Sequence, residues 1–133
     1  MDITKIDPLL LRHLQAQKEK LRIKFGVDPT NPDIHLGHAV PLRKLKEFQE
    51  LGHSVVFIIG DFTAQIGDPS GRIGARVPLT LKEASQNART YLEQVGKILD
   101  IKKTEIVFNS EFLSKMSFAE LFRLSHFFTV NQM

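Results

Sequence analysis

Residues 21–38 read LRIKFGVDPTNPDIHLGH, and this segment predicts a strand, a turn and the start of a helix, in that order. The strand covers Arg22–Val27, the DPTNP letters form the turn, and the helix begins near Gly37. Exposed N–H groups and the positive end of the helix dipole meet at such a helix start, which suits the binding of an anion. Gly37 lets the backbone approach a ligand, and His35 and His38 add hydrogen-bond donors for a phosphate. This chemistry is that of nucleotidyl transfer.

The rest of the chain alternates strands with helices. Two further strands are predicted, over Ser54–Gly60 and Thr104–Phe108, and the first of these is continuously apolar at its centre, as in a buried parallel strand. Helices are predicted from near Gly37 to Leu51, with Gly52 as the stop, from Thr80 to about Leu99, and from Ser117 onward; the letters TLKE and SFAE are capping boxes for the last two. The order predicts an α/β, Rossmann-like parallel sheet with flanking helices. We therefore expect an N-terminal helix over residues 1–20, capped by Asp7, and a partial Rossmann-like catalytic domain over residues 21–133.

Ligands of such sheets bind at the carboxyl ends of the strands. The segments Asp28–His38 and Gly60–Arg76 both follow predicted strands, so we expect them to share one cleft. Residues 61–78 are predicted to form a polar, glycine-rich loop, whose length in a compact domain favours a functional role.

Bulk composition narrows the class of protein. The chain has 133 residues, which fits one domain, and a mild formal net charge of +3 that does not by itself indicate nucleic acid. It has no cysteine, which excludes a disulfide scaffold and thiolate chemistry. The first residues lack the apolar stretch of a signal peptide, and the longest apolar run, Val55–Ile59, is far below the roughly 20 residues of a membrane span. We expect a cytoplasmic protein with no membrane partner.

The HLGH letters resemble the first signature of class I aminoacyl-tRNA synthetases, and their flanks sharpen the likeness. GVDPT precedes them and IGDFTAQIGDPSGR follows, which together resemble the bacterial tyrosyl-tRNA synthetases from about Leu21 to the final FTVNQM. The resemblance implies the N-terminal part of the catalytic domain. It also implies ATP with Mg²⁺ as substrate, no protein-bound metal, L-tyrosine and tRNA(Tyr) as further substrates, and a homodimer.

The resemblance assigns roles on the nucleotide side. His35 and His38 would contact the ATP phosphates and ribose, and Thr30 would contact the γ-phosphate. Asp28 would lie beside Thr30, near the substrate and the adenylate, and Gly37 would be a further ATP-binding residue. From the residues alone, the two histidines could instead be an N-cap and a packed core side chain.

Further roles are implied on the tyrosine side. Asp68 would bind the ammonium group of tyrosine, and Thr63 would line the same pocket. Arg72 and Arg76 would lie in a mobile loop that closes on pyrophosphate. The bland alternatives are a turn at the DPSG letters and solvated surface arginines.

Some positions depart from the family or match it weakly. Lys24 stands where one bacterial branch has the tyrosine that meets the substrate phenol, so the chain resembles the other branch and phenol recognition stays open. Asn109 matches an asparagine close to the cleft. The KMS letters at 115–117 resemble the second signature, KMSKS, but a capping box explains Ser117, and we interpret the match as coincidence.

The tyrosine-selecting helix, the second signature and the anticodon-binding domain are not among these residues. We therefore expect little or no charging activity from this chain alone. Two alternatives stay open, a free-standing nucleotidyltransferase and a non-catalytic, partner-binding fragment. The phenylalanine-rich C-terminal helix favours self-association.

Overall fold

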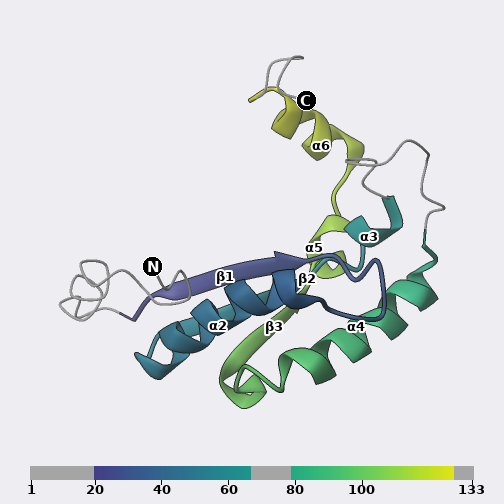
Figure 1. The fold of residues 1–133 in the computed structure, drawn as a ribbon. Coiled ribbons are helices and arrows are strands. Elements are labelled where there is room, and N and C mark those ends of the chain that lie inside the picture. Colours follow the sequence, from purple (N-terminus) through teal and green to yellow (C-terminus); the bar gives the residue numbers. More distant parts are fainter. Residues whose placement is uncertain (1–19, 67–78, 128–133) are drawn as a thin grey trace.

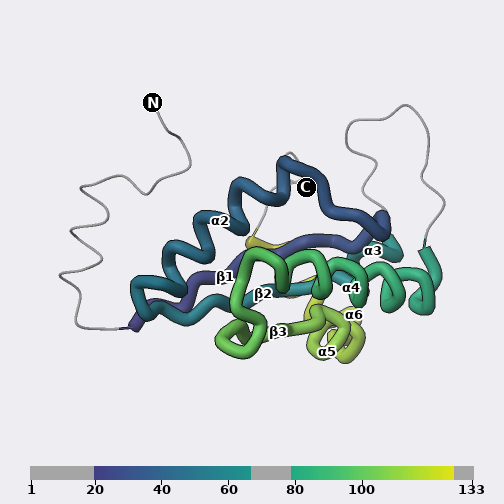
Figure 2. Tube along the Cα trace, turned by 60° about the horizontal axis from the view of Figure 1, so that its bottom comes forward, coloured from purple at the N-terminus to yellow at the C-terminus, as the bar shows by residue number. Residues whose placement is uncertain are grey.

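The computed structural model describes residues 20–66 and 79–127, which build a three-stranded parallel sheet with helices (Figure 1). The strands are β1 (Arg22–Val27), β2 (Ser54–Ile59) and β3 (Thr104–Phe108), with β2 in the middle (Figure 2). Helix α2 (Leu36–Glu50) follows β1, and α4 (Leu81–Val95) precedes β3. The predicted Rossmann-like α/β fold is therefore confirmed, while the predicted helix within residues 1–20 falls outside the described residues, apart from Lys20.

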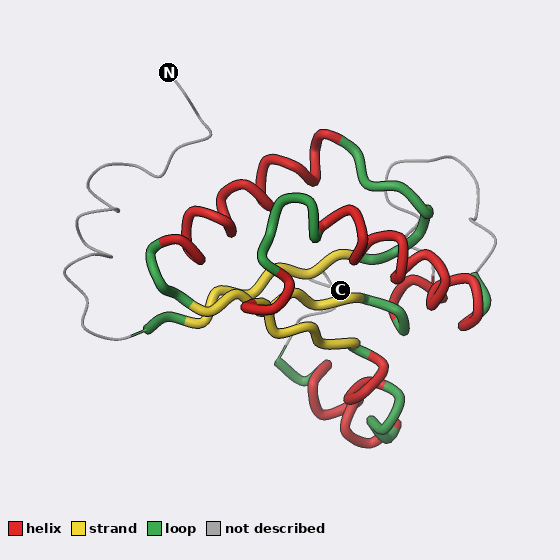
Figure 3. Tube along the Cα trace, turned by 90° about the horizontal axis from the view of Figure 1, so that it is seen from below, coloured by secondary structure: helices red, strands yellow, loops and turns green. Residues whose placement is uncertain are grey.

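Helices α2 and α4 lie on the same face of the sheet (Figure 3). The crossovers from β1 to β2 and from β2 to β3 run in the same direction along the sheet, so right-handed connections bring both helices to one face. Side chains two apart on a strand point to the same face, and those of β2 pack against these helices. The resulting core joins residues of β2, α2, α4 and the turn after α4: Leu42, Leu45, Val55, Phe57, Ile59, Ala88, Val95 and Leu99.

The predicted helix ends are mostly confirmed. His35 is the N-cap of α2, and Gly52, with φ of +89°, follows its C-cap. Thr80 caps α4 in a capping box with Glu83. The predicted extension of α4 to about Leu99 is wrong, because the helix ends at Val95 with Gly96 as its C-cap and the chain continues as turns. Leu99 is still buried, so the apolar pattern reflected packing rather than helix.

Two single-turn helices follow the carboxyl edge of the sheet, α3 (Thr63–Ile66) and α5 (Ser110–Leu113). The loop predicted over residues 61–78 is therefore helical at its start, where the Ala64 N–H donates to the Gly60 carbonyl and the Ala64 side chain is buried. Residues 67–78 lie outside the described part of the chain.

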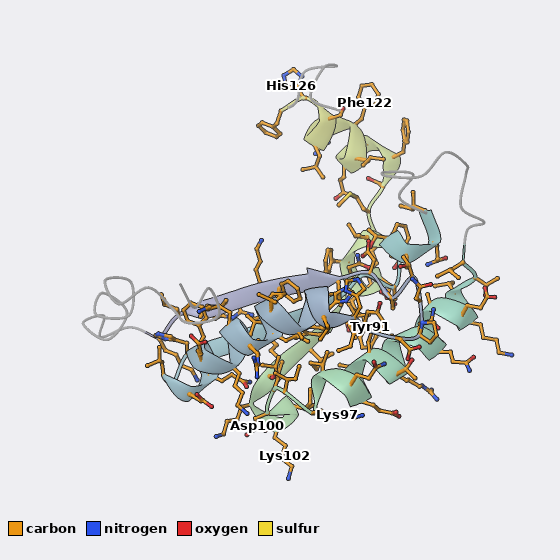
Figure 4. All side chains as sticks on the ribbon, viewed as in Figure 1. Tyr91, Lys97, Asp100, Lys102, Phe122 and His126 are labelled. Carbon is orange, nitrogen blue, oxygen red and sulfur yellow. The ribbon has the colours of Figure 1, made fainter. Side chains whose placement is uncertain are left out.

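Helix α6 (Phe118–Ser125) extends away from the sheet (Figure 1). Its capping box, formed by Ser117 and Glu120, is as predicted. Phe118 and Phe122 are 77% and 68% exposed, and Phe122 projects outward whereas Tyr91 lies within the body of the domain (Figure 4). None of the described helices is both long and apolar enough to cross a bilayer.

Candidate functional site

The three strands end side by side, and the residue after each strand enters one site. The Gly60 N–H donates to the Val27 carbonyl at 2.8 Å, and the Asn109 N–H donates to the Ile59 carbonyl at 2.9 Å. These bonds continue the sheet ladder past the strands. The residues that follow the three strands are thus held in register.

Side chains then link these ends to one another. The Thr63 hydroxyl donates to Asp28 Oδ1 at 2.7 Å, and Asn109 Nδ2 donates to Thr63 Oγ1 at 2.9 Å. Asn109 Oδ1 accepts from the Phe62 N–H at 2.9 Å. The starts of the two predicted loops are therefore adjacent, as expected for a shared cleft.

A second pair of side chains lies on the β3 side of this site. Asp61 is buried, and its two carboxylate oxygens accept from the Ser110 N–H at 3.0 Å and from the Ser110 hydroxyl at 2.6 Å. Both hydrogen bonds satisfy a carboxylate that would otherwise be costly to bury. This pair fixes the start of α5 against the end of β2.

Helix α4 holds the loop between β1 and α2. Asn87 Nδ2 donates to the Pro29 carbonyl at 3.0 Å, and Gln94 Nε2 donates to the Pro32 carbonyl at 3.0 Å. The Ile34 N–H donates to Gln94 Oε1 at 3.1 Å. Two amide side chains of a single helix thus fix a turn that cannot form a sheet or helix ladder of its own.

The two histidines of the HLGH letters cap α2. Nδ1 of His35 accepts from the Gly37 N–H at 3.1 Å, and Nδ1 of His38 accepts from the His35 N–H at 3.2 Å. Their ring centroids are 4.1 Å apart. Since each Nδ1 is an acceptor, each neutral imidazole carries its proton on Nε2. Both residues therefore keep an N–H donor for a ligand while they cap the helix.

Gly37 is required by the position of the His35 ring. A Cβ at residue 37 would lie 2.8 Å from Cε1 and 2.9 Å from Nδ1 of His35, closer than such atoms pack. Any other residue would push the imidazole away and break the cap. Gly37 therefore leaves the space that the His35 ring needs to cap the helix.

The electrostatics of the helix start favour an anion. Helix α2 has no acidic residue in its first turn to neutralise the positive end of its dipole. Burial, and then the neighbouring His35, lower the pKa of His38, which keeps this ring neutral near pH 7. Tyr91 contacts the His38 ring edge-on, with ring centroids 6.1 Å apart. Burial, and then the charges of Asp33 and Asp28, raise the pKa of Tyr91.

The sequence model of the tRNA synthetases class I (W and Y) matches residues 16–133. The chain belongs to this family. The HLGH letters of this chain lie at the start of α2.

Curated relatives agree with the family. The chain is 61% identical to a tyrosine–tRNA ligase of Thermotoga maritima over 117 residues, covering 88% of this chain and 29% of the relative. It is 52% identical to that of Xanthomonas euvesicatoria over 132 residues, covering 99% of this chain and 32% of the relative. The chain spans about a third of the length of these relatives.

Solved structures share the fold. The tyrosyl-tRNA synthetase of Archaeoglobus fulgidus, complexed with L-tyrosine, matches 91% of this chain and 35% of its own with a TM-score of 0.71 and 25% identity. A truncated mitochondrial tyrosyl-tRNA synthetase of Aspergillus nidulans matches 89% of this chain and 37% of its own, with a TM-score of 0.63 and 26% identity.

In this class I synthetase chain, the structure brings together part of the predicted site. The Asp28 carboxylate contacts the Thr63 hydroxyl. Thr30 lies in the turn after β1, and its N–H donates to the Asp28 carbonyl at 2.8 Å. His35 and His38 share the start of α2. The other predicted site residues, Asp68, Arg72 and Arg76, lie outside the described residues.

Sequence reasoning missed the supporting side chains. Asp61 is the second residue after β2, so its place at the carboxyl edge was a usable signal. Asn87 lies in the middle of α4 and Gln94 in its last turn, and nothing in the local pattern indicates that they bind the loop. Within residues 20–66 and 79–127, no group of three or more histidine, aspartate or glutamate side chains could hold a metal ion.

Proposed function

We propose that this chain is the N-terminal part of the catalytic domain of a tyrosine–tRNA ligase. The observation that carries the proposal is the pair of histidine caps at the start of α2, in a chain 61% identical to such a ligase over 117 residues. The complete enzyme would activate L-tyrosine with ATP and then transfer the tyrosyl group to tRNA(Tyr).

The nucleotide side of the site follows from the caps. The Nε2–H donors of His35 and His38 would bind the phosphates of ATP and stabilise the charge that develops on them. Gly37 keeps the His35 ring in place, and Thr30 would contact the γ-phosphate. Because both rings cap the helix already, they are orientated before the nucleotide binds, which lowers the cost of binding.

The amino-acid side uses carboxylates. Asp68 would bind the tyrosine ammonium, since a carboxylate in a partly desolvated cleft pairs well with a cation. Asp28 and Thr63 would lie beside it, and the hydrogen bond between them places both at the junction of the two loops. Arg72 and Arg76 would neutralise pyrophosphate as it leaves.

The reaction needs no covalent enzyme intermediate. A carboxylate oxygen of tyrosine attacks the α-phosphorus in line, the bond to the bridging oxygen breaks, and pyrophosphate departs with that electron pair. A ribose hydroxyl of the tRNA then takes the tyrosyl group and releases AMP. Mg²⁺ would arrive with ATP as part of the substrate. The protein positions the reactants and stabilises charge.

The complete enzyme would act as a homodimer, and exposed aromatic side chains on α6 suit a protein interface. The chain spans about a third of its relatives' length, so we expect only weak ATP binding and little or no charging activity from these residues alone.

Pyrophosphate exchange with each of the twenty amino acids tests the proposal, in a complete protein that carries these residues. A signal that requires tyrosine supports it. A signal without any amino acid would instead favour a free-standing nucleotidyltransferase, and absence of all exchange would favour a non-catalytic, partner-binding protein.

A further inference from the structure

The hydrogen bonds between Asn109, Thr63 and Asp28 have only one possible direction. The Phe62 N–H can only donate, so the side-chain atom of Asn109 that it meets at 2.9 Å is the oxygen. The amide nitrogen of Asn109 therefore faces Thr63 and donates to its hydroxyl oxygen at 2.9 Å. Asn109 is buried, which leaves its amide little freedom to turn over.

The hydroxyl of Thr63 has a single proton, and the geometry decides where it goes. Asp28 Oδ1 lies 2.7 Å away and is charged, whereas the Gly60 carbonyl lies 3.3 Å away. With Asn109 occupying one lone pair of the hydroxyl, the proton is directed to the carboxylate, which forms the stronger bond. The Phe62 N–H thus fixes the Asn109 amide, the amide fixes the Thr63 hydroxyl, and the hydroxyl fixes the Asp28 carboxylate.

Gly60 makes room for this arrangement. A Cβ at residue 60 would overlap both Asp28 Oδ1 and Thr63 Oγ1. The carboxylate therefore lies directly over the backbone at the end of β2. Within the described part of the chain, Asp28 Oδ2 takes part in no hydrogen bond, and the Asp28 side chain is exposed, so this oxygen is open to a ligand.

We propose that Asn109 is a positioning residue, which acts through the Thr63 hydroxyl to aim the Asp28 carboxylate at the reactants. This rests on the proposed function, because Asp28 is placed beside the tyrosine and the adenylate there. Asn109 itself would touch neither substrate. It follows β3, the strand on the far side of β2 from Asp28, and so couples the far strand to the reaction site.

The competing explanation is that Asn109 only ties the strand ends together. The chain provides a matched control for this in the Asp61–Ser110 pair. Ser110→Ala removes a hydrogen bond of 2.6 Å next to Asn109 and leaves the backbone bond from Ser110 to Asp61 in place. Ser110 bonds to Asp61 rather than to Thr63 or Asp28, so Ser110→Ala measures how much activity is lost when a hydrogen bond at the strand ends is removed.

The test measures tyrosine-dependent pyrophosphate exchange in a complete protein that carries these residues. Because small misplacements of a reacting group are costly, Asn109→Ala and Thr63→Val should each lower kcat/KM by about 10- to 100-fold. Thr63→Ser keeps the hydroxyl and should therefore retain more activity than Thr63→Val, whereas Ser110→Ala should stay within about threefold of the wild type. Thermal unfolding of each variant shows whether any loss of activity follows a loss of stability.

A second background isolates the route of the effect. If Asn109 acts on Asp28, then Asn109→Ala should change kcat/KM by less than about twofold when Asp28→Ala is already present. An equal loss in both backgrounds, a similar loss for Ser110→Ala, or unchanged activity in Asn109→Ala would each overturn the proposal.

Crystal structures of the chain separate this inference from the proposed function. The Asp28 carboxylate should rotate away from Thr63 in Asn109→Ala and stay in place in Ser110→Ala. An unmoved carboxylate in Asn109→Ala overturns the positioning role even in a protein without exchange activity. Conversely, a wild-type protein without tyrosine-dependent exchange contradicts the proposed function, whatever the carboxylate does.

Discussion

Gly37→Ala should abolish most activity while leaving the fold as stable as before. The added Cβ would lie 2.8–2.9 Å from the His35 ring, so the imidazole swings out and its cap on the Gly37 N–H is lost. Losing the cap costs about 1 kcal/mol of stability. Replacing glycine by alanine within a helix returns about 0.5–1 kcal/mol. The two effects nearly cancel.

The effect on catalysis has no such compensation. Moving His35 removes one preorganised donor from the phosphate site, which corresponds to about 3 kcal/mol, or roughly a 100-fold loss in kcat. His35→Ala should show the same catalytic loss, with much less effect on the ground-state affinity for ATP. Pyrophosphate exchange in the complete protein measures the rate, and thermal unfolding measures stability.

Gly52→Ala provides the matched control. Its φ of +89° is strained for alanine, and a Cβ there would meet nothing within 4 Å. The substitution should therefore cost about 1–2 kcal/mol of stability with unchanged exchange activity. Full activity in Gly37→Ala, or a loss of activity in Gly52→Ala as large as that in Gly37→Ala, would refute the reasoning.

Three further outcomes are expected. If Asp68 pairs with the tyrosine ammonium, Asp68→Asn should weaken the binding of tyrosine by about 3–5 kcal/mol more than the binding of its des-amino analogue. Equilibrium binding measurements that show equal weakening of both ligands would mean that Asp68 only shapes a turn. The pKa of His38 in the folded chain lies below the ordinary 6.5, so the contribution of His38 to stability is complete above pH 6.5 and is lost as the pH falls through the folded value. Thermal unfolding across pH 5–7.5 should show this loss of stability toward low pH, and His38→Gln should remove it. Helix α6 should drive self-association, so sedimentation at increasing concentration should show dimers or larger species that Phe122→Asp disperses and Leu81→Asp, at another exposed apolar position, does not; a wild-type monomer at high micromolar concentration contradicts the idea.

The sheet and the start of α2 could be predicted because their signals are local. The apolar run of β2, the capping boxes at Thr80 and Ser117, and Gly52 as a stop each depend on a few neighbouring residues. The end of α4 could not, because Leu99 keeps the apolar spacing while it packs from a turn.

The candidate site divides in the same way. The phosphate site at the HLGH letters stays a prediction, whereas the N-cap interpretation of His35 is confirmed, since its ring caps the helix. The partners of the loop, Asn87 and Gln94, could not be predicted, because their role depends on how α4 crosses the sheet. Contacts between residues about 60 apart leave no mark in a local pattern.

The hold of α4 on the loop between β1 and α2 has a consequence for biosynthesis. Pro32 and Ile34 find their partner, Gln94, only about 60 residues further along the chain. At about 5–20 residues per second, a ribosome needs roughly 3–12 s to make that stretch. Throughout this interval the nascent turn before the histidines lacks its anchor. Under the proposed function, affinity for a nucleotide should therefore arise abruptly once Gln94 has emerged from the exit tunnel, rather than when residues 35–38 emerge.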